Sequence, residues 1–449
     1  KESQKESVPD QSEENPIASQ EEAEDSREVL IEIISSQYID NYNFVACLVD
    51  EVQASSGWAY KDLLDDVINN DGRGISEIDN ETLSCSLYLS NEEIKEFIDG
   101  TSNTEIPIGE DLEVNSDQSW TILVYLMGDT DLEEFAIEDV LEMASVSTSP
   151  NLNIITLFDR SEIYTNQAIL NIPDFTDTKI FQITNGELTV LNDNLGEKNL
   201  GSPETFAEFI EYGLSAFPAD RTGLILWDHG AGWPGMGPDE DSGFDILTLE
   251  EMVSGLESGL ANSNIQKLDL IGFDACLMAT YEVARSMAPF ANVMVASQEL
   301  EPGHGWDWEA LEVITYNPSI EAAELGIEIA NSYRSQAIVS GTDIDITLSV
   351  IDLSKIDILD QAIRELSDSF LEASREISPK LGLSVNNALR FGKSPNPIDD
   401  SQMSDIGDFA ATLGLYEPSL LRDSNNLIDA MTDILINQVT GPATKSATG

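Results

Sequence analysis

A histidine and a cysteine each follow an apolar segment of this 449-residue chain. Residues 223–227 lead into the sequence DHGAGW, which contains His229, and residues 268–273 lead into DACLM, which contains Cys276. An imidazole next to a thiol can take its proton, and the resulting thiolate is a strong nucleophile. If the two segments are neighbouring strands, the pair predicts nucleophilic catalysis. The alternative is that Cys276 is a small buried apolar residue and His229 an ordinary loop side chain.

These two segments belong to a series of strand-like apolar runs that alternate with amphipathic helical patterns from Trp120 onward. The alternation predicts an α/β fold with a mainly parallel sheet and helices on both faces. Sites in such sheets lie beyond the carboxyl ends of the strands, where both reactive residues fall. The predicted strands are 121–127, 153–158, 223–227, 268–273, 292–296 and 347–351, and the predicted helices are 132–144, 203–215, 248–260, 279–288, 320–335 and 355–372.

Composition divides the chain into four parts. Residues 1–28 are acidic, contain little to bury, and are predicted to be a disordered tail. Residues 29–117 carry short helical patterns followed by a polar linker, and we interpret them as a small helical segment that is a candidate propeptide. The α/β domain is predicted at 118–440, followed by a C-terminal tail at 441–449. Since no apolar signal-peptide core opens the sequence, we expect the numbering to begin at a mature terminus.

The charge balance excludes some classes of function. The chain has 84 Asp and Glu residues against 21 Lys and Arg, a formal net charge of −63. A nucleic-acid-binding protein needs a basic face, and a membrane span needs about 20 consecutive apolar residues; the sequence offers neither. The acidity serves solubility in salt or attracts cations, either calcium or substrates rich in Lys and Arg.

The number and spacing of the cysteines exclude two further classes of protein. Three cysteines, Cys47, Cys85 and Cys276, are too few for a disulfide scaffold, and no CxxC motif indicates zinc. In an exported protein Cys47 and Cys85 can pair, which leaves Cys276 as the odd thiol.

The motifs ILWDHGAGW and LDLIGFDACLMATYEVA, in this order, resemble those of the clostripain family of cysteine peptidases. The fold of that family is similar to those of caspases, legumains and gingipains. The segments WTILVYLMGDTDLE, NLNIITLFDR and SQELEPGHGWDW agree as well, so the likeness runs from Trp120 to beyond Ser335. The resemblance implies a caspase-like fold and a cysteine endopeptidase that cleaves after Arg or Lys.

The resemblance also implies roles for individual residues. Cys276 would be the nucleophile, and His229 the general base and acid that forms the thiolate and protonates the leaving amine. The backbone N–H groups of Gly230 and Cys276 would form the oxyanion hole. No catalytic cofactor is implied.

A carboxylate before the cysteine is implied to select the substrate. Asp274 would lie in the S1 pocket and pair with the substrate's Arg or Lys; the alternative is that it caps a helix after the strand. Glu299, Glu301 and Asp307 follow the next strand and are expected to deepen the negative pocket. We expect protein or peptide substrates with a basic residue at the cleaved position, no nucleic-acid partner and a monomeric protein.

The loop between the two motifs departs from the family's pattern of activation by cleavage after a basic residue. Residues 230–275 contain a single cation, Lys267, directly before the second strand, which argues against self-cleavage in this loop. The acidic stretch 238–245 is a candidate calcium-binding segment, because some relatives require calcium for activation or stability.

We therefore expect a secreted or cell-envelope-associated enzyme. Two alternatives stay open: a related peptidase with a different S1 preference, and a calcium-dependent surface or adhesion module whose peptidase site is inactive.

Overall fold

A computed structural model describes residues 118–263, 265–394, 396 and 400–449 of the protein. The predictions for the acidic tail, for the helical segment up to residue 117 and for a Cys47–Cys85 pair lie outside these residues. The described residues include no helix with the length and apolarity needed to cross a membrane.

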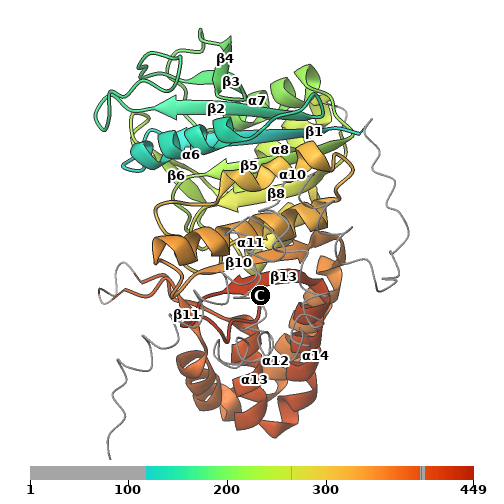
Figure 1. Ribbon diagram of the computed structural model, residues 1–449. Helices are drawn as coiled ribbons and strands as arrows, with labels where there is room; N and C mark the ends of the chain where they lie inside the picture. The colour runs from blue at the N-terminus through green and yellow to red at the C-terminus, as the bar shows by residue number, and fades with distance from the viewer. Residues whose placement is uncertain (1–117, 264, 395, 397–399) are drawn as a thin grey trace, which may run out of the picture. The chain divides into compact units, whose positions relative to one another are not determined.

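A nine-stranded sheet forms the centre of the α/β domain (Figure 1). Its strand order is β13-β10-β9-β8-β5-β1-β2-β3-β4. The five strands from β9 to β2 are parallel, and antiparallel strands extend the sheet on both sides. The strands are β1 Trp120–Gly128, β2 Leu152–Arg160, β3 Lys179–Thr184, β4 Glu187–Asn192, β5 Arg221–Trp227, β8 Leu268–Asp274, β9 Ala291–Ala296, β10 Thr347–Asp352 and β13 Leu435–Thr440.

The central strand shows why these sequences form buried parallel strands. All nine residues of β1 are buried, because helices cover both faces of the sheet. Successive side chains point to opposite faces. Ile122 and Val124 therefore belong to one apolar core, and Leu123 and Tyr125 belong to the other.

Two groups of helices cover the sheet, as Figure 1 shows. The core that contains Ile122 is closed by α6 Glu133–Ser145, η3 Trp308–Leu311, α10 Glu312–Tyr316 and α11 Ala322–Ser340. The opposite core is closed by α7 Pro203–Ala216, α8 Leu249–Ser263, α9 Tyr281–Met287, α12 Ile356–Asn387, α13 Ile406–Tyr416 and α14 Leu421–Ile434. Short 3₁₀ turns, η4 Leu353–Lys355 and η5 Pro418–Leu420, lead into α12 and α14. The expected α/β fold, mainly parallel and with helices on both faces, is confirmed.

Two small hairpins lie outside the main sheet. The first pairs β6 Met236–Asp239 with β7 Asp245–Leu247, in the connection between β5 and β8. The second pairs β11 Arg390–Phe391 with β12 Met403–Ser404, between α12 and α13.

The last described residues pack against the domain. The hydroxyl and the N–H of Thr448 donate to Asp405, the residue that caps α13, and Gln298 donates to the carbonyl of Gly449 at 2.9 Å. Residues 441–449, which the sequence sets apart as a tail, thus contact both α13 and the segment after β9.

Candidate active site

The two motifs are brought together by the pairing of β5 with β8. The strands are parallel neighbours, with Trp227 opposite Asp274. His229 and Cys276 each follow two residues beyond that pair. The expectation that the two strands are neighbours is confirmed.

Gly230 shows how closely the two loops approach. A Cβ atom added to Gly230 would lie 2.0 Å from the carbonyl oxygen of Cys276 and 3.0 Å from its nitrogen. Only glycine allows this contact of backbone with backbone. The residue after the histidine therefore touches the cysteine itself.

A carboxylate orients the histidine. Nε2 of His229 lies 2.8 Å from Oδ1 of Asp131, a residue in the loop after β1. When Nε2–H donates to this oxygen, the neutral imidazole keeps Nδ1 as its proton acceptor. The His229 side chain is 44% exposed, so a bound peptide can reach it.

The cysteine thiol is held in negative surroundings. Sγ of Cys276 accepts a hydrogen bond from the backbone N–H of Glu301 at 3.2 Å. Burial, followed by the charges of Glu301 and Asp274, raises the pKa of the thiol to about 11. The thiol is therefore protonated at neutral pH, and a base must take its proton during attack.

The residue after the cysteine has an unusual backbone conformation. Leu277 has φ = 65°, in the left-handed region that residues with a Cβ rarely adopt. Its N–H donates to the carbonyl of Glu299 at 3.1 Å, and its side chain is buried. Strain of this kind persists where surrounding contacts impose it and is common at functional sites.

Asp274 and Glu301 lie near the cysteine thiol, and a third carboxyl group, that of Asp139, interacts with Asp274. Asp274 accepts a hydrogen bond from the N–H of Trp306 at 3.1 Å, Glu301 interacts with Asp274, and Asp139 accepts from the indole of Trp227 at 2.5 Å. Burial raises the pKa of Asp274 to about 7, and burial and neighbouring charges raise the pKa values of Glu301 and Asp139 well above the usual range. None of the ion pairs within the described ranges involves these three groups.

Asp274 does not cap a helix, which was the alternative interpretation. It is the last residue of β8, and the next helix, α9, is capped by Thr280, whose hydroxyl accepts from the N–H of Val283. Gly305 packs against the carboxylate, because a Cβ on that glycine would lie 2.9 Å from Oδ1 of Asp274.

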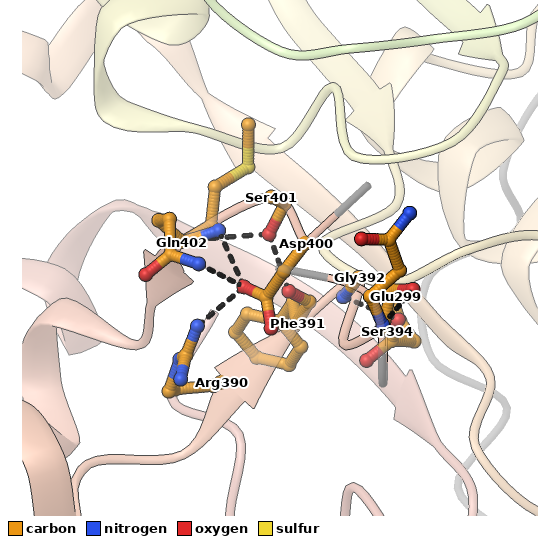
Figure 2. Close-up of polar contacts among 10 residues, drawn as sticks. Glu299, Arg390, Phe391, Gly392, Ser394, Asp400, Ser401 and Gln402 are labelled. Carbon is orange, nitrogen blue, oxygen red and sulfur yellow. Dashed lines mark hydrogen bonds and ion pairs between the residues drawn. The ribbon is translucent and has the colours of Figure 1, made fainter. Parts of the chain in front are cut away.

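The remaining predicted pocket residues are placed apart from this group. The side chain of Glu299 accepts from the N–H of Gly392 at 2.7 Å, close to the hairpin of β11 and β12, where Asp400 pairs with Arg390 (Figure 2). Asp307 caps η3 and accepts hydrogen bonds from the N–H of Glu309 and from Ser332. Both carboxylates thus have structural partners in this structure.

Two residues near the site were missed in the sequence. Asp131 lies in the quoted segment WTILVYLMGDTDLE but carries no spacing signal that ties it to His229. Asp139 had a usable signal, because it is an acidic residue on the apolar face of the predicted helix 132–144, between Ala136 and Met143. A carboxylate on a buried face needs a partner or a function.

Lys267, the one cation between the two motifs, does not offer an open site for cleavage. Its ammonium group donates to the carbonyl of Ala288 at 2.6 Å, and the residue directly precedes β8.

Comparison with known proteins identifies the family. The sequence model of the clostripain family (peptidase C11) matches residues 124–414, well over half of the chain. Clostripain from Hathewaya histolytica is 31% identical over 227 residues, which cover 44% of this chain and 42% of that protein. This chain thus spans less than half the length of that curated relative.

Solved structures share the fold. A secreted C11 cysteine protease from Bacteroides thetaiotaomicron, in complex with an irreversible peptide inhibitor, has a TM-score of 0.55 at 20% identity, covering 72% of this chain and 85% of that one. An inactive zymogen C11 protease from Parabacteroides distasonis has a TM-score of 0.54 at 21% identity, with the same coverage. At these identities the likeness establishes the caspase-like fold. From the match over 124–414, the chain belongs to the clostripain family.

Proposed function

We propose that the protein is a cysteine endopeptidase that cleaves peptide bonds after Arg or Lys. The observation that carries the proposal is the contact between the two loops that follow β5 and β8, which brings the His229 and Cys276 segments together. Membership of the clostripain family supports it.

The chemistry follows from the two side chains. Sγ of Cys276 attacks the scissile carbonyl carbon while Nδ1 of His229 takes the thiol proton. The carbonyl oxygen becomes an oxyanion, the C–N bond then breaks, and His229 returns the proton to the leaving amine. Water, deprotonated by His229, next attacks the thioester, which releases the carboxylate product and regenerates the thiol.

Backbone groups are available for the oxyanion. The N–H of Gly230 and that of Cys276 take no part in the turn and loop hydrogen bonds of the described residues. Both groups lie where the two loops touch, and we propose that they donate to the same substrate carbonyl oxygen. Such fixed donors stabilise the charge that develops in the transition state.

The buried carboxyl groups support a preference for basic residues. Oδ2 of Asp274 and Oε2 of Glu301 are buried and have no hydrogen-bond partner apart from the contact between these two carboxyl groups. An unpartnered carboxylate in such a place is costly, and a substrate guanidinium or ammonium supplies both charge and donors. A neutral substrate side chain would leave these oxygens unpaired, which gives specificity.

We also place the protein outside the cell or at the cell envelope. The strongly acidic composition suits that setting, and one structural relative is described as secreted. Polycationic substrates would be drawn by the field of the whole molecule, an attraction that salt screens.

Active-site labelling tests the proposal. An acyloxymethyl ketone built on Arg should label the full chain at a single site, and Cys276→Ala should abolish the labelling. His229→Ala should slow it strongly, while Asp193→Asn, a change of an exposed side chain away from these loops, should not.

Each other outcome has a meaning. Labelling by Asp- or Asn-based reagents in place of Arg and Lys reagents would indicate a peptidase with another S1 preference. No labelling by any reagent, with or without calcium, would contradict the peptidase proposal and favour a surface module with an inactive site.

A further inference from the structure

The turn that follows Cys276 is held by the segment after β9. Leu277, with φ = 65°, donates its N–H to the carbonyl of Glu299 at 3.1 Å. The N–H of Ala279 donates to the carbonyl of Ser297 at 2.7 Å. A left-handed conformation is unfavourable for a leucine by itself, so contacts with the rest of the protein must maintain it.

The backbone of Glu299 is itself fixed by buried hydroxyl groups. Its N–H donates to the hydroxyl of Thr347 in β10 at 3.0 Å and to that of Ser297 at 3.2 Å. Its carbonyl also accepts from the hydroxyl of Ser297 at 2.9 Å, and both hydroxyl-bearing residues are fully buried. The carbonyl that accepts from Leu277 is therefore anchored to the sheet.

The side chain of Glu299 joins this segment to the hairpin of β11 and β12. Oε1 accepts from the N–H of Gly392, directly after β11, at 2.7 Å, and from the N–H of Leu300 at 3.0 Å (Figure 2). A Cβ added to Gly392 would lie 3.1 Å from both Cδ atoms of Leu277, so the backbone of Gly392 lies against that side chain. Leu277, Glu299 and Gly392 thus contact one another in a closed triangle.

The same segment reaches the sulfur atom. The N–H of Glu301, two residues beyond Glu299, donates to Sγ of Cys276 at 3.2 Å. On the other side, the carbonyl of Cys276 packs against Gly230. A shift of Glu299 would therefore move both the turn after Cys276 and the donor at its sulfur.

We propose that Glu299 is a positioning residue: its carboxylate holds the hairpin of β11 and β12 against Leu277 and so fixes the orientation of the Cys276 thiol. This inference rests on the proposed peptidase function. It gives Glu299 a role other than the S1 charge expected from the sequence. Glu299 is 9% exposed and its Oε1 accepts two backbone N–H groups, so the side chain acts as an acceptor within the protein.

Two conservative variants separate the reach of the side chain from its charge. Glu299→Gln keeps the length and an acceptor oxygen but removes the charge, whereas Glu299→Asp keeps the charge and is one methylene shorter. On an Arg reporter peptide, Glu299→Asp should lower kcat by about tenfold or more, because a small displacement of the reacting groups is costly. KM should change by less than about threefold, since the proposed S1 carboxylate is untouched.

Glu299→Gln should keep kcat within about threefold of the parent value, because the acceptor oxygen is retained. Glu187→Gln, which changes an exposed carboxylate in β4, is the matched control and should behave like the parent. Circular dichroism would establish that all three variants are folded.

The opposite order of activities would overturn the inference. A carboxylate that pairs with the substrate cation is retained in Glu299→Asp and lost in Glu299→Gln, so only the latter would then lose its preference for Arg over a neutral residue. Equal kcat in the parent and in Glu299→Asp would also contradict a positioning role.

Hydrogen exchange measures the contact without relying on turnover. The amide of Leu277 is protected by its hydrogen bond to Glu299, so residues 277–279 should exchange about tenfold faster or more in Glu299→Asp and at the parent rate in Glu299→Gln. Unchanged exchange in Glu299→Asp would overturn the inference alone. The expected exchange in a parent protein that no Arg reagent labels would instead contradict the proposed function.

Discussion

The surroundings of Cys276 link substrate selection to thiol reactivity at the level of single residues. The charges of Glu301 and Asp274 contribute to the raised pKa of the thiol. A substrate cation bound at Asp274 would offset these charges and bring the thiol pKa down. We therefore expect the thiol of Cys276 to become easier to ionise when a basic substrate side chain binds at Asp274.

Replacing Asp274 tests its proposed role in substrate recognition. Asp274→Ala should lower kcat/KM on Arg and Lys substrates by about a hundredfold or more, since breaking a buried charge pair costs about 3–5 kcal/mol. Activity on substrates with a neutral residue at that position should change far less. Reporter peptides that differ only at the cleaved residue measure the two losses in kcat/KM. Equal losses on basic and neutral peptides would indicate that Asp274 has a structural role.

The pKa of Asp274 also predicts how cation binding depends on pH. The carboxyl group must be ionised to pair with a cation, and its pKa is raised to about 7 by burial. Below that value binding must expel a proton, so affinity should rise by up to about tenfold per pH unit and level off above about pH 8. Calorimetry with agmatine, a decarboxylated arginine, would measure this in Cys276→Ala, where thiol ionisation plays no part.

The matching control is Asp274→Asn in the same background. This variant should bind agmatine weakly, with little dependence on pH over the same range. Affinity in the parent that falls as pH rises would contradict the assignment.

At the scale of elements, the contact between the loops after β5 and β8 depends on one glycine. Gly230→Ala would drive a methyl group into the backbone of Cys276 and shift the thiol, so kcat/KM should fall by about a hundredfold or more. Gly382→Ala is the control, because nothing lies within 4 Å of its added Cβ inside α12. That change should leave activity intact and stabilise the fold by about 0.5–1 kcal/mol, measured by denaturant unfolding. Full activity of Gly230→Ala would show that the close contact is dispensable.

The six strands of the sheet with strong apolar runs could be predicted, because burial on both faces leaves an unmistakable pattern. β3, β4 and β13 were not, since these strands at or next to the edges of the sheet are partly exposed and have mixed sequences. Helix α12 runs to Asn387, beyond the predicted end at residue 372, and contains Pro379. A proline in the sequence favours the end of a helix, and in α12 tertiary packing outweighs this preference.

The candidate site was predictable where a residue follows a recognisable strand. His229, Cys276 and Asp274 have that property, since parallel neighbours bring their carboxyl ends to one edge. Asp131 comes from a loop whose approach to His229 depends on the three-dimensional path of the chain. Its contact could therefore be inferred only from the structure.

At the scale of the whole molecule, buried acidic groups should make stability fall as pH rises. Glu142 and Asp274 have pKa values raised to about 7, so the folded state holds protons that the unfolded chain loses above about pH 4. Their stabilising effect is complete at low pH and is lost as pH rises through 7. Self-repulsion of a chain with net charge −63 acts in the same sense.

Thermal unfolding in the presence of a chelator measures this effect. The unfolding temperature should fall between about pH 5.5 and about pH 8. Added salt should raise the unfolding temperature more at the higher pH than at the lower pH, because it screens the repulsion between carboxylates. Glu142→Gln should flatten the slope, and an unfolding temperature that rises over this interval would contradict the expectation.

The connection between β10 and β13 spans α12, α13 and α14 (Figure 1). Its hairpin of β11 and β12 reaches the loops that follow β5 and β8. There the N–H of Gly392 donates to Glu299 (Figure 2). The Cε atom of Met403 lies 2.5 Å from where a Cβ of Gly232 would be. Met403→Ala should thus alter the profile of a peptide library while Cys276 labelling by a small reagent keeps its rate. Sequence variation in this hairpin can change which residues a substrate must carry next to the cleaved bond. Relatives with the same two motifs can therefore differ in substrate specificity while their chemistry stays the same.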